Sequence, residues 1–353
     1  MPVLRTGSSI LADQEGSFLP SAASQPIIDI HGLVKRYGDF TAVNGIDLAV
    51  EPGEIFGILG PNGAGKTTTL EMIEGLREPD AGSITVSGLD AVRDSEKVRT
   101  LIGVQLQTTS LFEYLTAAEL IELFAGLYDV DASSARVHEL LGLVNLQDKA
   151  KSQVSTLSGG QRQRLSITLA LVNRPKVVFL DEPTTGLDPA ARRDLWQVIR
   201  NVRASGATVV LTTHYMEEAE VLCDRVAVMD RGRVIASDTP AALIASLGIE
   251  SVIEARVSGG ELDEADLQAL PNIIQAGITD DKIELRTRNV QSTLIALMRL
   301  VEQRDITLAE LISEQSTLED VFLSLTGRSI GADEANPDES PVPVATAGRS
   351  RRA

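Results

Sequence analysis

The stretch IFGILGPNGAGKTTTL, residues 55–70, decides the fold of this chain. Its first part, Ile55–Leu59, is an uninterrupted apolar run with the length of a buried strand. The next part, Gly60–Lys66, has the spacing G-x-x-x-x-G-K and is followed by Thr67. Glycines in such a loop let successive backbone N–H groups converge on phosphate oxygens, and the following helix adds the positive end of its dipole. The sequence therefore predicts a phosphate-binding loop between a strand and a helix.

Two side chains of this loop have separate tasks. We expect Lys66 to reach the β- and γ-phosphates and the Thr67 hydroxyl to hold Mg²⁺. The alternative is a glycine-rich strand-to-helix turn without a ligand, but the strand, loop, lysine and hydroxyl all fall in the required order. The predicted nucleotide-binding residues are Gly60, Pro61, Asn62, Gly63, Ala64, Gly65, Lys66, Thr67 and Thr68.

The composition limits the kinds of partner. Of the 353 residues, 43% are hydrophobic, and a chain of this length should hold more than one domain. The net charge of −18 makes it a poor general binder of nucleic acid. No apolar run reaches the ~18 residues of a membrane-spanning helix, and Arg5 is not followed by the apolar segment of a secretory signal. We therefore expect a cytoplasmic protein, with Cys223, the single cysteine, as a buried structural thiol.

Strands and helices are predicted to alternate along the chain. Apolar residues recur at helical spacing between Thr116 and Ala150, and Gly38-Asp39 has the character of a hairpin turn. The alternation predicts a mainly parallel sheet with helices on both faces. The strands are predicted at Ile27–Tyr37, Thr41–Val50, Ser83–Val86, Leu101–Gln107, Val177–Leu180, Thr208–Thr212, Val226–Met229 and Arg233–Ala236.

The segment LSGGQ, Leu157–Gln161, opens a predicted helix. Ser158 and Gln161 have capping-box spacing, which by itself explains a helix start. A cap does not need Gly159 and Gly160, however, and each glycine in a helix costs about 1 kcal/mol relative to alanine. The pair is useful if a phosphate must approach the bare backbone at the helix N-terminus.

Two adjacent acids, Asp181 and Glu182, follow the apolar strand Val177–Leu180. Carboxylates at the end of a buried strand are costly without a partner, and Mg²⁺ is the partner we expect. Asp181 would hold the metal, directly or through water, and Glu182 would orient and polarise the attacking water.

Four further side chains have ordinary explanations when each is taken alone. Tyr37 is an aromatic residue at a strand end, Gln107 a loop glutamine, Asp188 a helix N-cap, and His214 a hydrogen-bonding group in a turn. Any functional role for them depends on the motifs around them.

Taken in order, these motifs make the chain resemble the nucleotide-binding subunits of ATP-binding cassette (ABC) transporters over roughly Ile27–Leu247. The most specific element is LSGGQ, placed between the phosphate loop and the segment VVFLDEPT. The resemblance implies a P-loop NTPase core, an antiparallel β subdomain and a helical signature subdomain at about 108–173. It also implies ATP and Mg²⁺ as cofactors.

The resemblance also implies a role for each matching residue. Tyr37 stacks on adenine, Gln107 senses Mg²⁺ and couples to the membrane subunit, and His214 acts as the switch histidine. Asp181 binds the metal together with Thr67 and Gln107, Glu182 is the catalytic acid, and Asp188 lies in a dimer-contacting loop. The signature residues, which contact the nucleotide of the opposite protomer, are Leu157, Ser158, Gly159, Gly160 and Gln161.

One position departs from the family pattern. Many relatives have proline directly before the coupling glutamine, whereas Leu106 precedes Gln107 here. Gln105 lies two residues earlier and is the alternative, although the spacing from Gly103 favours Gln107.

The C-terminal part is predicted to form a small α/β domain. Val252–Val257 and Ile283–Arg286 are expected to be strands, and Val290–Glu302 an amphipathic helix. The segment STLEDVFLSLTGR, Ser316–Arg328, is similar to the C-terminal extension of export-type subunits and has a capping-box spacing at Ser316 and Glu319. The resemblance implies a regulatory or dimer-stabilising role.

We therefore expect disordered tails at 1–25 and 329–353, an ATP-binding domain at 26–247 and a C-terminal domain at 248–328. The resemblance implies a head-to-tail dimer, a homodimer in the simplest case, on the cytoplasmic face of the cell membrane. It would drive export of a drug, antibiotic or lipid-like molecule through a separate integral-membrane permease, without nucleic acid. The alternatives are an ATPase acting on ribosomes or DNA, an importer subunit and a drug-sequestering resistance protein.

Overall fold

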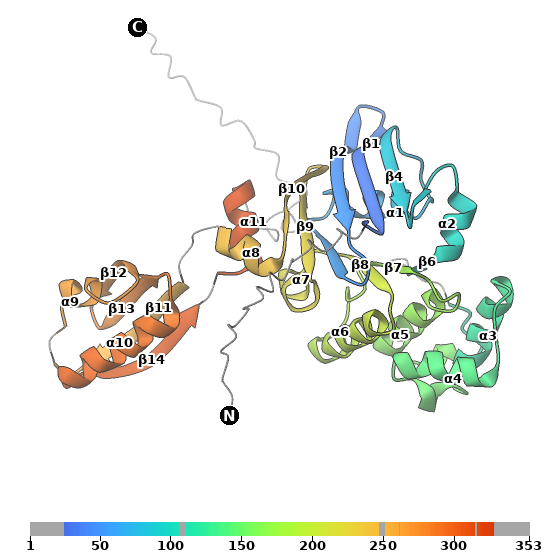
Figure 1. Cartoon of the computed structure of the whole chain (residues 1–353). Coiled ribbons are helices and arrows are strands. Elements are labelled where there is room, and N and C mark those ends of the chain that lie inside the picture. Colours follow the sequence, from blue (N-terminus) through green and yellow to red (C-terminus); the bar gives the residue numbers. More distant parts are fainter. Residues whose placement is uncertain (1–24, 106–110, 247–250, 261, 315, 328–353) are drawn as a thin grey trace, which may run out of the picture.

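A computed structural model describes residues 25–105, 111–246, 251–260, 262–314 and 316–327. These residues form three sheets, two in the part that resembles an ATP-binding cassette, called the cassette below, and one in a smaller C-terminal unit (Figure 1). Among the described residues, no helix is both long and apolar enough to cross a membrane.

The central sheet has six strands in the order β10-β9-β3-β8-β7-β6. All neighbours are parallel except the edge strand β10, which is antiparallel to β9. Side chains of β3 alternate between two cores, since Phe56 and Ile58 join one cluster and Ile55 and Leu59 the other. The predicted parallel sheet, covered on both faces, is confirmed. Its strands are β3 (Ile55–Leu59), β6 (Ile102–Gln105), β7 (Val177–Asp181), β8 (Thr208–Thr213), β9 (Arg225–Asp230) and β10 (Arg233–Asp238).

A second, antiparallel sheet covers one face together with two helices. Its order is β2-β1-β4-β5, and Tyr37 pairs with Phe40 across the predicted hairpin turn. The elements are β1 (Ile28–Tyr37), β2 (Phe40–Val50), β4 (Ala81–Val86), β5 (Leu89–Asp90), α1 (Lys66–Ile73) and α2 (Ser95–Leu101).

The other face is covered by helices. The helical pattern predicted over 116–150 is interrupted, because Asp129 adopts a positive φ of 54° and Ser133 caps a new helix. Cys223 is buried as predicted, between these helices and the sheet. The helices are α3 (Ala117–Leu127), α4 (Ser134–Leu143), η1 (Gln147–Lys149), η2 (Val154–Thr156), α5 (Gly159–Ala170), α6 (Pro189–Ala204), α7 (Met216–Leu222) and α8 (Pro240–Ser246).

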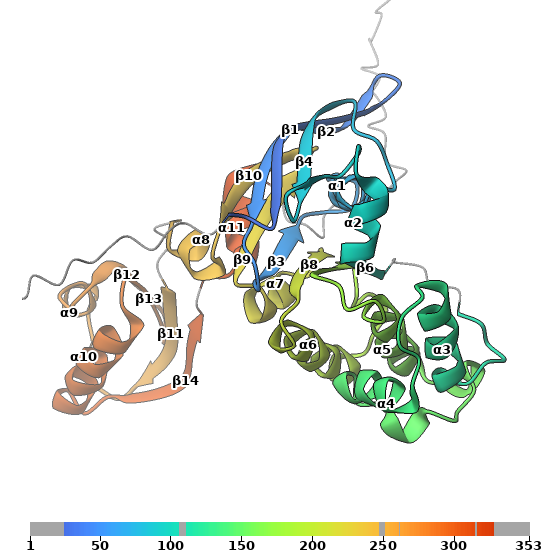
Figure 2. The same ribbon diagram turned by 45° about the vertical axis from the view of Figure 1, so that its right-hand side comes forward.

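The C-terminal unit is a split β-α-β-β-α-β fold with its own apolar core. Its sheet order is β12-β13-β11-β14 with antiparallel neighbours throughout, and Figure 2 shows it beside the cassette. The elements are β11 (Ser251–Ser258), α9 (Glu264–Gln268), β12 (Ile273–Thr279), β13 (Lys282–Thr287), α10 (Val290–Gln303) and β14 (Thr307–Glu314).

The last helix, α11 (Leu318–Thr326), returns to the cassette. Its buried side chains Leu318, Val321 and Phe322 belong to the helical core of the cassette, and the Leu318 N–H donates to Glu220 Oε1 at 2.6 Å. The helix is capped by Thr317 and Asp320, one residue later than the predicted pair Ser316 and Glu319. The C-terminal unit is thus an insertion between two helices of the cassette.

Candidate functional site

The phosphate-binding loop follows β3 and is packed too tightly to accept larger residues. Gly65 is the N-cap of α1 with φ of 101°, a conformation that favours glycine. A Cβ at Gly65 would overlap the Ala42 carbonyl oxygen, and one at Gly60 the Met229 carbonyl oxygen. The loop therefore presents its backbone to a ligand because the neighbouring strands leave no room for side chains.

Lys66 begins α1 and points back over this loop. Its side chain is 4% exposed, and Nζ donates to the carbonyl oxygens of Gly60 at 2.8 Å and Pro61 at 3.2 Å. Nζ also lies 3.4 Å from Glu182 Oε1. Burial lowers the pKa of Lys66, and the charge of Glu182 opposes that shift. The ammonium group lies among oxygen atoms, the kind of partner that a bound phosphate would also offer it.

Asp181 ends β7 and gathers two hydroxyl groups. Thr67 Oγ1 donates to Asp181 Oδ1 at 3.2 Å, and Thr212 Oγ1 on the neighbouring strand β8 donates to the same oxygen at 2.5 Å. Burial raises the pKa of Asp181 even though both hydroxyls stabilise its charge. A carboxylate beside a threonine hydroxyl at a phosphate loop is a donor set that fits Mg²⁺, which binds few protein ligands together with phosphates and waters.

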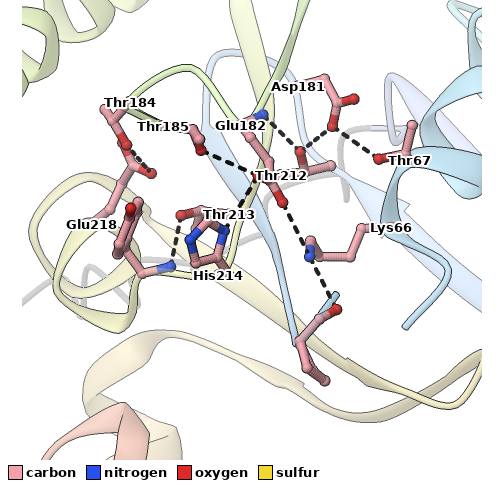
Figure 3. A network of polar contacts seen from close by, with 12 residues as sticks. Lys66, Thr67, Asp181, Glu182, Thr184, Thr185, Thr212, Thr213, His214 and Glu218 are labelled. Carbon is pink, nitrogen blue, oxygen red and sulfur yellow. Dashed lines mark hydrogen bonds and ion pairs between the residues drawn. The ribbon is translucent and has the colours of Figure 1, made fainter. Parts of the chain in front are cut away.

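Glu182 is held in a strained backbone conformation. Its φ of 45° lies in the left-handed region, which for a residue other than glycine costs of order 1–3 kcal/mol. Thr212 fixes this conformation, because its Oγ1 accepts the Glu182 N–H at 2.9 Å. In this conformation the Glu182 side chain points toward Lys66 of the phosphate loop, as Figure 3 shows.

The carboxylate of Glu182 has three neighbours. Lys66 lies at Oε1, while Oε2 accepts from Thr185 Oγ1 at 3.2 Å and lies 3.3 Å from His214 Nδ1 (Figure 3). Burial opposes ionisation of Glu182, but Lys66, His214 and Thr185 together lower its pKa. The group is therefore an ionised base near the phosphate loop.

His214 follows β8, and its ring is packed on one side by Tyr215. The two ring centroids are 4.1 Å apart, and the Arg192 guanidinium lies 4.3 Å from the centre of the Tyr215 ring. This stack fixes the imidazole beside Glu182.

Lys66, Thr67, Glu182 and His214 line one cavity of about 690 Å³, a size suited to a nucleotide. Tyr37 and Phe40, at the turn between β1 and β2, line the same cavity. Tyr37 is 41% exposed, with the guanidinium of Arg77 5.3 Å and the ammonium of Lys35 5.9 Å from its ring centre. An exposed aromatic face and a phosphate loop in one cavity match the adenine and the phosphates of ATP.

The signature segment lies outside this cavity. Ser158 caps α5 and forms both bonds of the predicted box, donating from its N–H to Gln161 Oε1 at 2.9 Å and accepting from the Gln161 N–H at 3.3 Å. Leu157 is buried, whereas Ser158 and Gly159 are exposed. The glycine pair therefore presents a bare helix N-terminus to the surface.

Of the other predicted residues, Asp188 also lies away from the cavity, and Gln107 cannot be placed. Asp188 caps α6, where Oδ1 accepts from the N–H groups of Ala190 and Ala191 at 2.9 Å. Gln107 and Leu106 lie outside the described residues. Gln105 is buried at the end of β6, opposite Leu180.

Thr212 and Thr185 are site residues that the sequence interpretation missed. Thr212 was assigned only as part of a strand, although its hydroxyl contacts both acids of the site. The available signal was a polar residue inside an apolar strand, at the position paired with Asp181.

The fold and this cavity define a P-loop ATPase. The profile of the ABC transporter family matches residues 43–185. A Nod factor export ATP-binding protein I of Ralstonia nicotianae is 38% identical over 314 residues, 88% of this chain and 97% of the relative. The daunorubicin resistance ATP-binding protein DrrA3 of Streptomyces coeruleorubidus is 40% identical over 87% of this chain and 98% of the relative. The linearmycin resistance ATP-binding protein LnrL of Bacillus subtilis is 36% identical over 86% and 99%.

Solved structures agree with these relatives. The cbiO1 subunit from Clostridium perfringens matches with a TM-score of 0.58 and 28% identity, over 64% of this chain and 92% of that chain. The MJ0796 cassette, a dimer in a post-hydrolysis state with ADP and Pi, matches with a TM-score of 0.54 and 29% identity, over 60% and 98%. The chain belongs to the ABC transporter family and is an ATP-binding, ATP-hydrolysing subunit, which confirms the predicted resemblance.

Proposed function

We propose that this chain powers an export-type ABC transporter, with Glu182 as the base that activates water. The observation that carries this proposal is the position of Glu182, held between Lys66 and His214 at the phosphate end of the cavity. The names of the relatives support export, because they include Nod factor export and two antibiotic-resistance proteins.

In the proposed reaction, Tyr37 holds the adenine and the loop Gly60–Thr68 holds the phosphates. Lys66 exchanges its contacts with loop carbonyls for β- and γ-phosphate oxygens, which stabilises charge that develops during transfer. Glu182 orients and polarises the attacking water, and His214 bonds the γ-phosphate or that water. Mg²⁺, held by Thr67, Asp181 and Gln107, would offset negative charge on the phosphates.

We further propose a head-to-tail dimer. One cassette carries one phosphate loop and one signature segment, and its own signature segment is exposed outside its own cavity. Ser158–Gln161 would close on the nucleotide of a second copy, with Asp188 near the contact. The match to a dimeric MJ0796 cassette supports this arrangement. ATP would then bridge two protomers, and hydrolysis would remove the bridge.

The transported molecule would cross the membrane through a separate permease subunit docked near the Gln107 loop. This places the chain at the cytoplasmic face of the membrane. A drug, antibiotic or lipid-like molecule is the proposed cargo, by analogy with the relatives. The C-terminal unit, which holds β11–β14 within the predicted range 248–328, is proposed to regulate or stabilise the dimer. A role on ribosomes or DNA is disfavoured by the net charge of −18 and by these relatives.

The test is purification of the tagged chain from gently solubilised membranes of its native cell. We expect a multi-span protein to co-purify, and vesicles containing both proteins to export daunorubicin or linearmycin when ATP is supplied. The same vesicles with Glu182→Gln should bind ATP but not transport. Recovery of ribosomes or DNA-associated factors in place of a membrane protein would overturn export and leave the ATPase assignment standing.

A further inference from the structure

A buried acid that the proposed reaction does not use lies behind the site. Glu218, on α7, has 0% of its surface exposed. Its Oε2 accepts from Thr184 Oγ1 at 3.1 Å (Figure 3), and its Oε1 accepts from Trp196 Nε1 at 3.1 Å. Two donors therefore reach it, one from the loop after β7 and one from α6.

Glu218 is connected to the segments of both proposed catalytic residues. Thr184 lies between Glu182 and Thr185, whose hydroxyl bonds the Glu182 carboxylate. Glu218 itself lies on α7, which follows His214 directly and has Tyr215 as its N-cap. The bond between Thr184 and Glu218 therefore joins the segment that carries the base to the segment that carries the histidine.

A second connection runs through α6. The charge of Arg192 acts on Glu218, and the same guanidinium lies over the ring of Tyr215, which packs on His214. Arg192 is one helical turn beyond Asp188, and its N–H bonds the Asp188 carbonyl oxygen at 2.9 Å. The N-terminus of α6, proposed to contact the second protomer, is therefore linked to the same acid.

Packing alone does not account for a carboxylate at this position. Burying a charge costs free energy even when it is hydrogen-bonded, and replacing buried ionic groups by well-packed apolar side chains is often neutral or stabilising. Burial raises the pKa of Glu218, and Thr213, Thr184 and Trp196 oppose that shift. What the carboxylate supplies, and an apolar residue does not, is a fixed spacing between its donors.

We propose that Glu218 is a positioning residue for ATP hydrolysis, which holds the Glu182 and His214 segments at the separation that lets both act on one γ-phosphate. This inference rests on the proposed catalytic role of Glu182. Glu218 does not line the ligand cavity, and it acts through Thr184 and through α7, the helix that follows His214.

The test replaces the carboxylate by an amide of the same shape. In Glu218→Gln one acceptor oxygen becomes an NH₂ group, which cannot accept from Thr184 or Trp196. We expect kcat to fall on the order of 10- to 100-fold, as for small displacements of reacting groups, with the Kd for ATP unchanged within about twofold. The matched control is Glu217→Gln, an exposed neighbour on the same helix, which should keep wild-type kcat.

A double-mutant cycle separates positioning from a loss of general stability. If Glu218 acts through His214, then Glu218→Gln should lower kcat little further in a His214→Ala background. Additive losses of kcat, or a loss of ATP affinity equal to the loss of kcat, would overturn the proposal. The proposal would also be overturned if Glu218→Gln kept the wild-type kcat while Glu182→Gln was inactive.

Two further results keep the proposal separate from the proposed function. If Glu182→Gln retains turnover, the base assignment fails whatever Glu218→Gln does. If Glu218→Gln does not fold, Thr184→Val removes the hydroxyl donor to Glu218 and leaves the acid in place. This variant should then lower kcat by at least about threefold without weakening ATP binding, and an unchanged kcat would overturn the positioning role.

Discussion

The phosphate loop and the signature segment both begin a helix with glycine-rich backbone, yet they differ in what surrounds them. Lys66, at the start of α1, is 4% exposed and contacts loop carbonyls and Glu182. Ser158, at the start of α5, is exposed, and the hydrogen bond described for its hydroxyl is to the Gln161 N–H within its own capping box. One helix start faces a cavity of its own chain, and the other faces outward.

The difference indicates which half of the site a single chain completes. The residues proposed to bind adenine and phosphate line one cavity, together with Thr67 and the proposed base. The signature segment also begins a helix with bare backbone, but it does not line this cavity. Changes in the phosphate-loop cavity should therefore alter binding or chemistry in the isolated chain. Changes in the signature segment should alter only steps that need a second copy.

The largest expected effect is loss of the base. Glu182→Gln keeps the shape of the side chain but removes its ability to accept a proton, which is typically worth 10²–10⁴-fold in rate, so we expect kcat to fall about 10³-fold. ATP binding, measured by equilibrium titration, should remain. Turnover near that of wild type would show that another group is the base. It would also remove the main distinction between the phosphate-loop cavity and the signature segment.

Removal of the buried lysine should weaken binding. Lys66→Ala deletes the charge-assisted bonds expected with phosphate, and each such bond is worth about 1.5–3 kcal/mol. We expect the Kd for Mg-ATP to rise on the order of 10- to 100-fold, as measured by fluorescence titration. Lys97→Ala, which removes an exposed lysine on α2, is the control. Tight Mg-ATP binding by Lys66→Ala would contradict the assignment of Lys66.

Ser158→Ala tests the outward-facing side. The loss of an N-cap costs about 1 kcal/mol of stability, so a matched control must lose the same kind of cap. Thr116→Ala provides it, because Thr116 and Glu119 form a capping box at α3. Both variants should lose similar stability in urea unfolding. Only Ser158→Ala should lower kcat, by roughly tenfold, with ATP binding by the isolated chain intact.

A loss of ATP binding in monomeric Ser158→Ala would place the signature segment in the site of its own chain. Equal loss of kcat in both capping variants would reduce its role to helix stability. Either result would break the comparison between the two helix starts.

The smallest expected effect concerns stability at the far end of α1. Glu74 is 2% exposed, and burial raises its pKa to about 8, with Asp181 and Glu71 adding to the shift. Its folded pKa lies above its unfolded value, so the folded state keeps a proton that the unfolded chain releases. The contribution of this proton to the free energy of unfolding is fully present below pH 4.5 and is lost as the pH rises toward 8.

Glu74→Gln should remove that loss of stability with rising pH. In urea unfolding, the variant should show a flatter pH dependence between about pH 5 and 8, where one extra bound proton corresponds to about 1.4 kcal/mol per pH unit. At pH 8 the variant should be the more stable protein. Glu78→Gln, at an exposed residue four positions further along, is the control. An unchanged slope in Glu74→Gln would show that Glu74 is not the group that titrates.

The sequence was sufficient for those parts of the site whose chemistry is local. The spacing of the phosphate loop predicts a strand, a turn and a helix, and all three are present as β3, the loop and α1. The parallel sheet follows from apolar runs separated by helices, and it places Asp181 and Thr212 side by side. Local patterns succeed here because a buried parallel strand needs few polar positions.

Features that depend on contacts between distant segments could not be predicted in this way. The role of Thr212 requires the register of β7 against β8, and the bonds of Glu218 require the packing of α6 on α7. The interruption at Asp129 divides one helical pattern into two helices, α3 and α4, and both contribute buried side chains to one core. The position of α11 on the cassette also depends on tertiary packing that no periodicity reveals.

The insertion of the C-terminal unit has a thermodynamic consequence. Val252, near the start of β11, pairs with Glu314, at the end of β14, so the chain enters and leaves the unit at adjacent points. When the unit is folded, α11 is tethered to α8 by a short effective loop, and each halving of loop length saves about 0.6 kcal/mol of closure entropy. Folding of the unit and docking of α11 therefore favour each other. Any molecule that binds the folded unit would also tighten α11 on the cassette, at a distance from the ATP site.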